Sequence, residues 1–193
     1  MTRPFISAAL ALTLIVPLSA LAAEETYVIE PVHSQPIFEL QHMGGFSTQR
    51  GSFGKVSGKV VLDRATHKGS ADVTIDTSSI HTISEKLDTH VKGEDFFNVA
   101  KYPTMTFKSS NLTFDGDKLV AMDGELTMLG IAKPVSLKVT NFVCGEHPFN
   151  KKPMCGAEGT ASIKRSEWGM KYGIPKAIGD DVKITLPIEA YRE

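Results

Sequence analysis

The sequence has few of the residue patterns on which enzymatic or metal chemistry usually depends. Cysteine occurs twice and tryptophan once in 193 residues. There is no G-x-S-x-G motif and no pair of histidines spaced H-x-x-x-H, which argues against a nucleophile elbow and a metalloprotease site. The glycines at 44, 45, 51 and 54 have no helix after them, so they indicate turns and bends, not a phosphate-binding loop. The sequence therefore predicts no catalytic residues, no cofactor and no metal.

Clusters of basic charge are also missing. Arg3 is the one basic residue before position 23, so the rest of the chain carries 20 Lys and Arg against 22 Asp and Glu, spread along its length. Such a weakly acidic, dispersed balance argues against nucleic acid and anionic membrane surfaces as partners.

The N-terminus resembles a secretory leader. Arg3 precedes an uncharged run from Phe5 to Leu21, and a small-residue A-x-A pattern ends at Ala22, just before Glu24 and Glu25. These features predict a signal peptide over residues 1–22, cleaved after Ala22. The remaining 171 residues form one domain, 23–193, which we expect to be soluble and to work in the periplasm or after secretion.

Export also determines the expected state of the two cysteines. Cys144 and Cys155 bracket a short polar segment. Outside the cytoplasm such a pair is expected to form a disulfide, which would close the tip of a hairpin.

Most of the domain alternates apolar and polar residues with a period of two, which is typical of antiparallel strands. One helix interrupts the pattern near residues 83–92, where Thr82 and Glu85 are spaced as a capping box and Ile83, Leu87 and Val91 recur every four residues. Asp115-Gly116 predicts a tight hairpin. About eight strands with short turns favour a closed barrel over a two-sheet sandwich, which needs the same alternation. The expected strands cover residues 38–42, 55–62, 71–76, 103–110, 111–114, 118–128, 134–143, 157–164 and 181–190.

Large and flexible apolar side chains are abundant, and they either fill such a barrel or line a cavity inside it. We take them as candidates for the wall of an apolar ligand cavity: Phe38, Leu40, Phe46, Phe53, Phe96, Phe97, Met105, Phe107, Met128, Trp168 and Ile174. For a ligand head group at the cavity mouth, the candidates are His33, His42, His90 and Lys92.

Several blocks of the sequence resemble the YceI-like family of bacterial periplasmic proteins. The most specific are D-F-F-N-x-x-K-Y-P at residues 95–103 and L-T-M-x-G-x-x-K-P-V at residues 126–135. Shorter matches are His33-Ser34, Gly51-Ser52-Phe53, Asp88-Thr89-His90-Val91 and Arg165-Ser166-Glu167-Trp168-Gly169. The resemblance covers essentially the whole domain. Leu87 stands where the family usually has an arginine, which removes one guanidinium that could hold an anionic head group.

The resemblance implies an all-β fold, an extended antiparallel lipocalin-like barrel whose cavity holds a polyisoprenoid such as a quinone tail or a polyprenyl phosphate. The implied function is binding, transport or storage of that lipid without catalysis. The alternatives are sequestration of amphiphiles such as antibiotics as a stress response, a quinone-linked or metal-dependent enzyme built on the histidines, and an interaction module with a solid barrel. Both a monomer and a homodimer are compatible with the sequence.

Overall fold

The structure is a computed structural model that describes residues 24–193. The signal peptide predicted at residues 1–22 lies outside these residues. None of the helices in the described part is long and apolar enough to cross a membrane.

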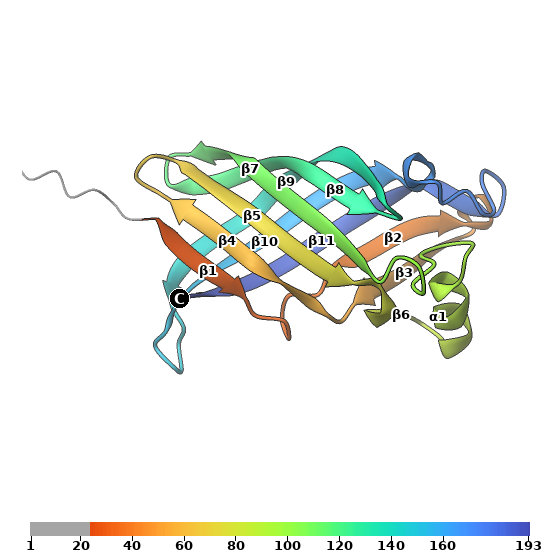
Figure 1. The fold of residues 1–193 in the computed structure, drawn as a ribbon, viewed down its shortest axis with the longest axis horizontal. Coiled ribbons are helices and arrows are strands. Elements are labelled where there is room, and N and C mark those ends of the chain that lie inside the picture. Colours follow the sequence, from red (N-terminus) through yellow and green to blue (C-terminus); the bar gives the residue numbers. More distant parts are fainter. Residues whose placement is uncertain (1–23) are drawn as a thin grey trace, which may run out of the picture.

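An antiparallel sheet forms nearly all of the fold, as the period-two alternation predicts (Figure 1). In β11, for example, Val182 is buried whereas Asp181 and Lys183 are exposed. The strands are β1 (Glu25–Ile29), β2 (Ile37–His42), β3 (Ser47–Phe53), β4 (Val56–Asp63), β5 (Lys68–Asp76), β6 (Ile80–Thr82), β7 (Thr104–Asp115), β8 (Lys118–Met128), β9 (Ile131–Glu146), β10 (Pro153–Lys164) and β11 (Ile178–Arg192).

Pairing of β1 with β11 closes the sheet into a barrel. The ring runs β1-β4-β5-β7-β8-β9-β10-β11, which is eight strands, and β2, β3 and β6 continue the wall from β11. Both β1 and β2 pair with β11, at opposite ends of that long strand. Closure leaves these eight strands no free edge and confirms the barrel over the sandwich.

The barrel is elongated, and its two ends differ (Figure 1). The hairpin end carries the turns at residues 64–67, 116–117 and 147–152, and the helix end carries helix α1 (Glu85–Lys92) and the β10–β11 connection at residues 165–177. The Asp115-Gly116 hairpin is confirmed, since Asp115 faces Lys118 and Gly116 has a positive φ of 55°.

Helix α1 forms near its expected position, but its N-cap differs from the prediction. The side chain of Ser84 accepts the hydrogen bond from Leu87 N, so Ser84 and not Thr82 caps the helix. The apolar face is also shorter than expected, because Val91 is buried and Leu87 half-buried whereas Ile83 is 79% exposed.

Three strands were missed by the sequence pattern: β1, β3 and β6. Gly51, expected in a turn, lies within β3 and pairs with Phe38 of β2. A side chain at position 51 would have its Cβ 2.5 Å from the Phe38 ring, so glycine allows this ring to lie against the strand. The strands expected at 103–110 and 111–114 form one continuous strand, β7, with a bulge between Ser109 and Asn111.

The expected disulfide is present. Cys144 in β9 faces Cys155 in β10 directly across the ladder, and their Cα atoms are 4.1 Å apart. The bond therefore links the two strands next to the 147–152 loop at the hairpin end.

Replacing both cysteines with alanine should lower the free energy of unfolding by about 3 kcal/mol, because the bond closes a short loop and limits the unfolded chain. Urea titration of wild type and variant measures the difference. Wild type reduced in solution is the control, and it should lose a similar amount of stability. Equal stability of the oxidised and reduced protein would contradict the prediction.

Candidate functional site

The inward faces of the strands enclose a cavity of about 220 Å³. Its lining reaches from Leu62 and Cys155 near the hairpin end to Val91 and Phe96 at the helix end, so the cavity follows the barrel axis. Nearly every lining side chain is aliphatic or aromatic. Such an interior can hold an apolar molecule but offers few directed polar contacts.

Eight of the predicted cavity residues line this space: Phe38, Leu40, Phe53, Phe96, Phe97, Met105, Phe107 and Met128. They were candidates because they are large and apolar, and the structure places six of them on strands and Phe96 and Phe97 in the segment that follows α1. Whether they contact a ligand stays a prediction.

Three predicted cavity residues lie elsewhere. Phe46 is 93% exposed at the β2–β3 turn, where no strand directs it inward, so its assignment to the cavity wall is wrong. Trp168 is only 1% exposed but packs behind the lining, and its indole N–H donates to Leu126 O at 3.1 Å. Ile174 is half-buried in the β10–β11 connection and does not reach the cavity.

Tyr27 shows how the lining stays apolar. Its ring lines the cavity at the hairpin end, whereas its hydroxyl donates to a Glu25 carboxylate oxygen at 2.8 Å. Burial, together with that carboxylate, raises the pKa of Tyr27. The hydrogen bond from Tyr27 in turn holds the pKa of Glu25 below its ordinary value. The polar group is thus satisfied without facing the ligand space.

The four head-group candidates do not line the cavity, and the structure does not bring them together. His42 ends β2, and its Nδ1 lies 3.5 Å from the hydroxyl of Ser47. His90 and Lys92 lie in the last turn of α1 at the helix end. A role for these three residues at a mouth stays a prediction.

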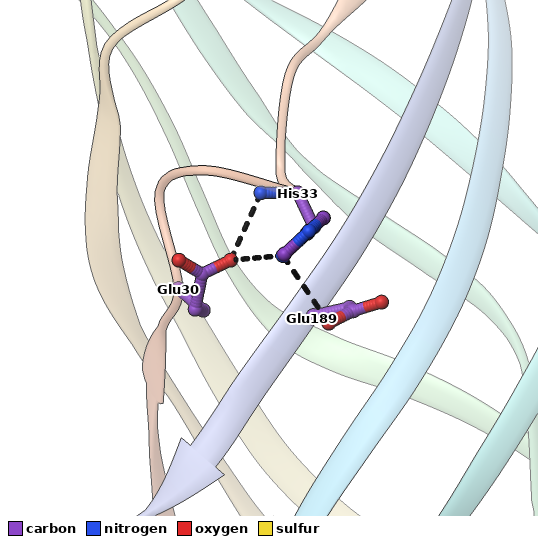
Figure 2. A group of neighbouring side chains, drawn as sticks. All are labelled: Glu30, His33 and Glu189. Atoms are coloured by element: carbon purple, nitrogen blue, oxygen red, sulfur yellow. Dashed lines mark hydrogen bonds and ion pairs between the residues drawn. The ribbon is translucent and has the colours of Figure 1, made fainter.

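His33, the fourth head-group candidate, does not line the cavity either. It lies in the turn between β1 and β2, beside Glu30 and Glu189 on the barrel wall, and its side chain is 66% exposed (Figure 2). Partial burial would raise the pKa of Glu30, but hydrogen bonds from Val32 N, His33 N and the His33 ring outweigh it and lower that pKa. The imidazole and carboxylate atoms of Glu30, His33 and Glu189 that could bind a metal ion lie within 4.8 Å of one another. Because the carboxylate already accepts these three bonds, the arrangement fits a cap of the turn.

Asp88 links helix α1 to strand β6 of the barrel wall. One of its carboxylate oxygens accepts from both the backbone N–H and the hydroxyl of Thr82 at 2.6 Å, and the other lies 3.0 Å from His81 Nδ1. These contacts, that of the Thr82 hydroxyl first, hold the pKa of Asp88 below its ordinary value. They position Val91, which lines the cavity from the same helix.

Sequence reasoning missed one polar residue of the cavity, Arg165. This residue is among those that line the cavity at the helix end, and it is 1% exposed. The signal was present, since Arg165 begins the R-S-E-W-G block, but a lone arginine after a strand does not show which way its side chain turns.

A closed antiparallel barrel around an apolar cavity is the architecture of proteins that enclose small apolar molecules. The chain belongs to the YceI-like family, since the YceI-like domain matches residues 27–190.

Its relatives agree with this assignment over most of their length. Protein YceI of Escherichia coli O157:H7 is 32% identical over 91% of this chain and 90% of its own. A UPF0312 protein of Pseudomonas aeruginosa is 34% identical over 90% of each chain. The crystal structure of BcnA from Burkholderia cenocepacia is 27% identical, with a TM-score of 0.72 over 83% of this chain and 98% of its own. A Saccharophagus degradans protein described as a polyisoprenoid binding domain shares the fold at 16% identity, with a TM-score of 0.66 over 86% of this chain and 98% of its own.

Asp88→Asn should lower the free energy of unfolding by about 1–2 kcal/mol at pH 7, because an amide has one acceptor oxygen and cannot accept from both Thr82 and His81. Since the folded-state pKa of Asp88 is lowered, its stabilisation is complete above the unfolded pKa and is lost as the pH falls through the folded value. The difference in the free energy of unfolding between variant and wild type should therefore become smaller below about pH 4. Urea titrations at neutral and acidic pH measure it.

Asp95→Asn is the matched control. Asp95 is 53% exposed and lies 3.4 Å from His90, so its removal should change stability little. Equal losses of stability in the two variants would show that the contacts of Asp88 do not stabilise the position of the helix.

Proposed function

We propose that this protein binds a polyisoprenoid or a similar amphiphile in its internal cavity, without catalysis, and carries or stores it in the periplasm. The apolar lining of the closed barrel is the observation that supports this most directly. Each buried CH₂ of a prenyl chain contributes roughly 0.8 kcal/mol, so affinity can grow with chain length and needs few polar contacts.

The composition of the cavity wall favours binding over chemistry. Among the described residues that line it, there is no histidine, carboxylate or serine, and Cys155 is held in the disulfide. General acid–base or nucleophilic catalysis needs such groups within hydrogen-bond reach of the substrate. The structural relative described as a polyisoprenoid binding domain supports the ligand class.

The predicted signal peptide supports the proposed periplasmic location. Residues 1–22 have the features of a signal peptide, and an aqueous compartment between membranes is where a long apolar molecule needs a soluble carrier. Uptake of other amphiphiles during stress is a second use of the same cavity, because an apolar wall containing methionine and aromatic side chains adapts to different guests.

Protein purified from its native host without detergent should carry an isoprenoid or related amphiphile, and ligand-free protein should bind geranylgeraniol at a ratio of about one to one. Native mass spectrometry measures both. A protein that is empty as isolated and takes up no prenyl lipid on titration would refute the proposal.

Gly159→Phe should abolish this binding while leaving the barrel folded. Gly159 faces Leu186 and Val139 across the ladders, all three line the cavity, and an added Cβ would lie 3.7 Å from Leu186, an ordinary contact. The new ring would therefore occupy the ligand space. Native mass spectrometry and a thermal melt report binding and folding separately.

Gly145→Phe on the neighbouring strand β9 is the matched control. Gly145 is exposed, it does not line the cavity, and an added Cβ would meet nothing within 4 Å. This variant should keep wild-type binding. A folded Gly159→Phe variant that binds as well as Gly145→Phe would place the ligand outside the cavity.

A further inference from the structure

Two carboxylates and one imidazole meet on the outside of the barrel, where the turn after β1 lies against β11 (Figure 2). Nδ1 of His33 lies 2.9 Å from Oε2 of Glu30 and 3.8 Å from Oε2 of Glu189. Atoms that bind one zinc ion at about 2.0–2.2 Å lie roughly 3–4 Å from one another. The separations between the ring nitrogen and the two oxygens therefore fit a shared metal ion.

The hydrogen bonds that cap the turn can persist when an ion binds. Oε1 of Glu30 accepts from Val32 N, and Oε2 accepts from His33 N and from the His33 ring. A carboxylate oxygen has two lone pairs, so Oε2 can keep the bond from His33 N and bind an ion in place of the ring N–H. The proton of the neutral imidazole then resides on Nε2, and Nδ1 offers its lone pair to the ion. Only one hydrogen bond of the cap is exchanged for metal coordination.

The charge at this point of the wall favours a cation. Within residues 24–193, His33 is the only basic side chain that pairs with Glu30 or Glu189, and no lysine or arginine does so. Two carboxylates beside one neutral imidazole leave an uncompensated negative charge. A divalent ion would balance it and would become the largest local charge.

The backbone holds the two sides of this site together. Glu30 N donates to Glu189 O at 2.8 Å, and the buried hydroxyl of Ser34 accepts from Glu189 N at 2.9 Å. The side chains of His33 and Glu189 are 66% and 41% exposed, so an ion can reach them from solvent without opening the barrel. The three residues thus start from fixed backbone positions, and binding needs only small changes of side-chain rotamer.

We propose that Glu30, His33 and Glu189 form a binding site for a divalent transition-metal ion such as Zn²⁺, which links the β1–β2 turn to β11 on the outside of the barrel. An imidazole combined with carboxylates suits zinc, whereas Mg²⁺ and Ca²⁺ prefer oxygen ligands alone. Water completes the coordination on the exposed side. None of the three residues lines the cavity, so the site is independent of the proposed lipid binding.

Isothermal titration calorimetry tests the site on protein that EDTA has freed of metal, with ZnCl₂, MgCl₂ and CaCl₂ as separate titrants at neutral pH. Each chain should bind a single Zn²⁺, about tenfold or more tightly than Mg²⁺ or Ca²⁺. His33→Gln and Glu189→Gln should each weaken Zn²⁺ binding about tenfold or more, because even the loss of a group that only orients a metal ligand has an effect of this size. Both positions are exposed, and either folded variant is sufficient to decide the result.

His81→Gln and Glu125→Gln are the matched controls. His81 is 74% exposed and lies 3.0 Å from a single carboxylate, that of Asp88, and Glu125 is an exposed residue of β8. Both variants should bind Zn²⁺ as wild type does.

Thermal melts with Zn²⁺ and with EDTA give a second measurement. Zn²⁺ should raise the melting temperature of wild type and of both controls but not that of His33→Gln, because an ion that binds only the folded state stabilises it. Wild-type protein that binds no Zn²⁺, or that binds Mg²⁺ equally well, would overturn the proposal. Wild-type affinity in the site variants, or an equal loss in the controls, would also overturn it.

Discussion

The pairing of β1 with β11 is the constraint on which the rest of the structure depends. Three residue pairs close the ring: Tyr27 with Arg192, Val28 with Tyr191 and Ile29 with Ala190. Without them the inner faces of two edge strands would meet water, and no enclosed space would exist. Closure turns an alternating sequence into a barrel with an apolar interior.

Ser34 maintains this closure where the chain passes from β1 to β2. The turn at residues 30–36 leaves a gap in the ladder beside β11, and the Ser34 hydroxyl fills it by donating to Glu189 O at 3.1 Å and accepting from Glu189 N at 2.9 Å. Because Glu30 N also donates to Glu189 O at 2.8 Å, the fully buried Ser34 side chain supplies the one missing partner, the acceptor for Glu189 N. It lets β11 pass from β2 to β1 without leaving the Glu189 N–H unpaired.

Alternation allowed most of the wall to be predicted, and the exceptions have physical reasons. Strands such as Lys118–Met128 have one face in the core and one in water, so the pattern itself defines them. β3, Ser47–Phe53, is largely polar with a glycine at its centre, and β6 has three residues, so both form because neighbouring strands offer hydrogen bonds. Such tertiary pairing leaves no period in the sequence.

The cavity wall could be predicted for the same reason, and the polar sites could not. Met105 and Phe107 occupy inward positions of β7, and the strand period alone places them. His33 depends on the path of a turn, and Arg165 on carbonyls five to fourteen residues further along the chain. Direction of a long side chain in a connection is set by what it can bond to, and only the folded structure supplies those partners.

The shape and the chemistry of the cavity have a common consequence for binding. Its lining follows the barrel axis and is almost entirely aliphatic or aromatic, so an apolar chain inside it gains dispersion contacts along its length. Strand pairing holds this wall, and at the helix end Arg165 adds four hydrogen bonds to backbone carbonyls of the β10–β11 connection and the start of β11. A ligand therefore meets an interior whose shape folding has already fixed, and less ordering of the protein accompanies binding.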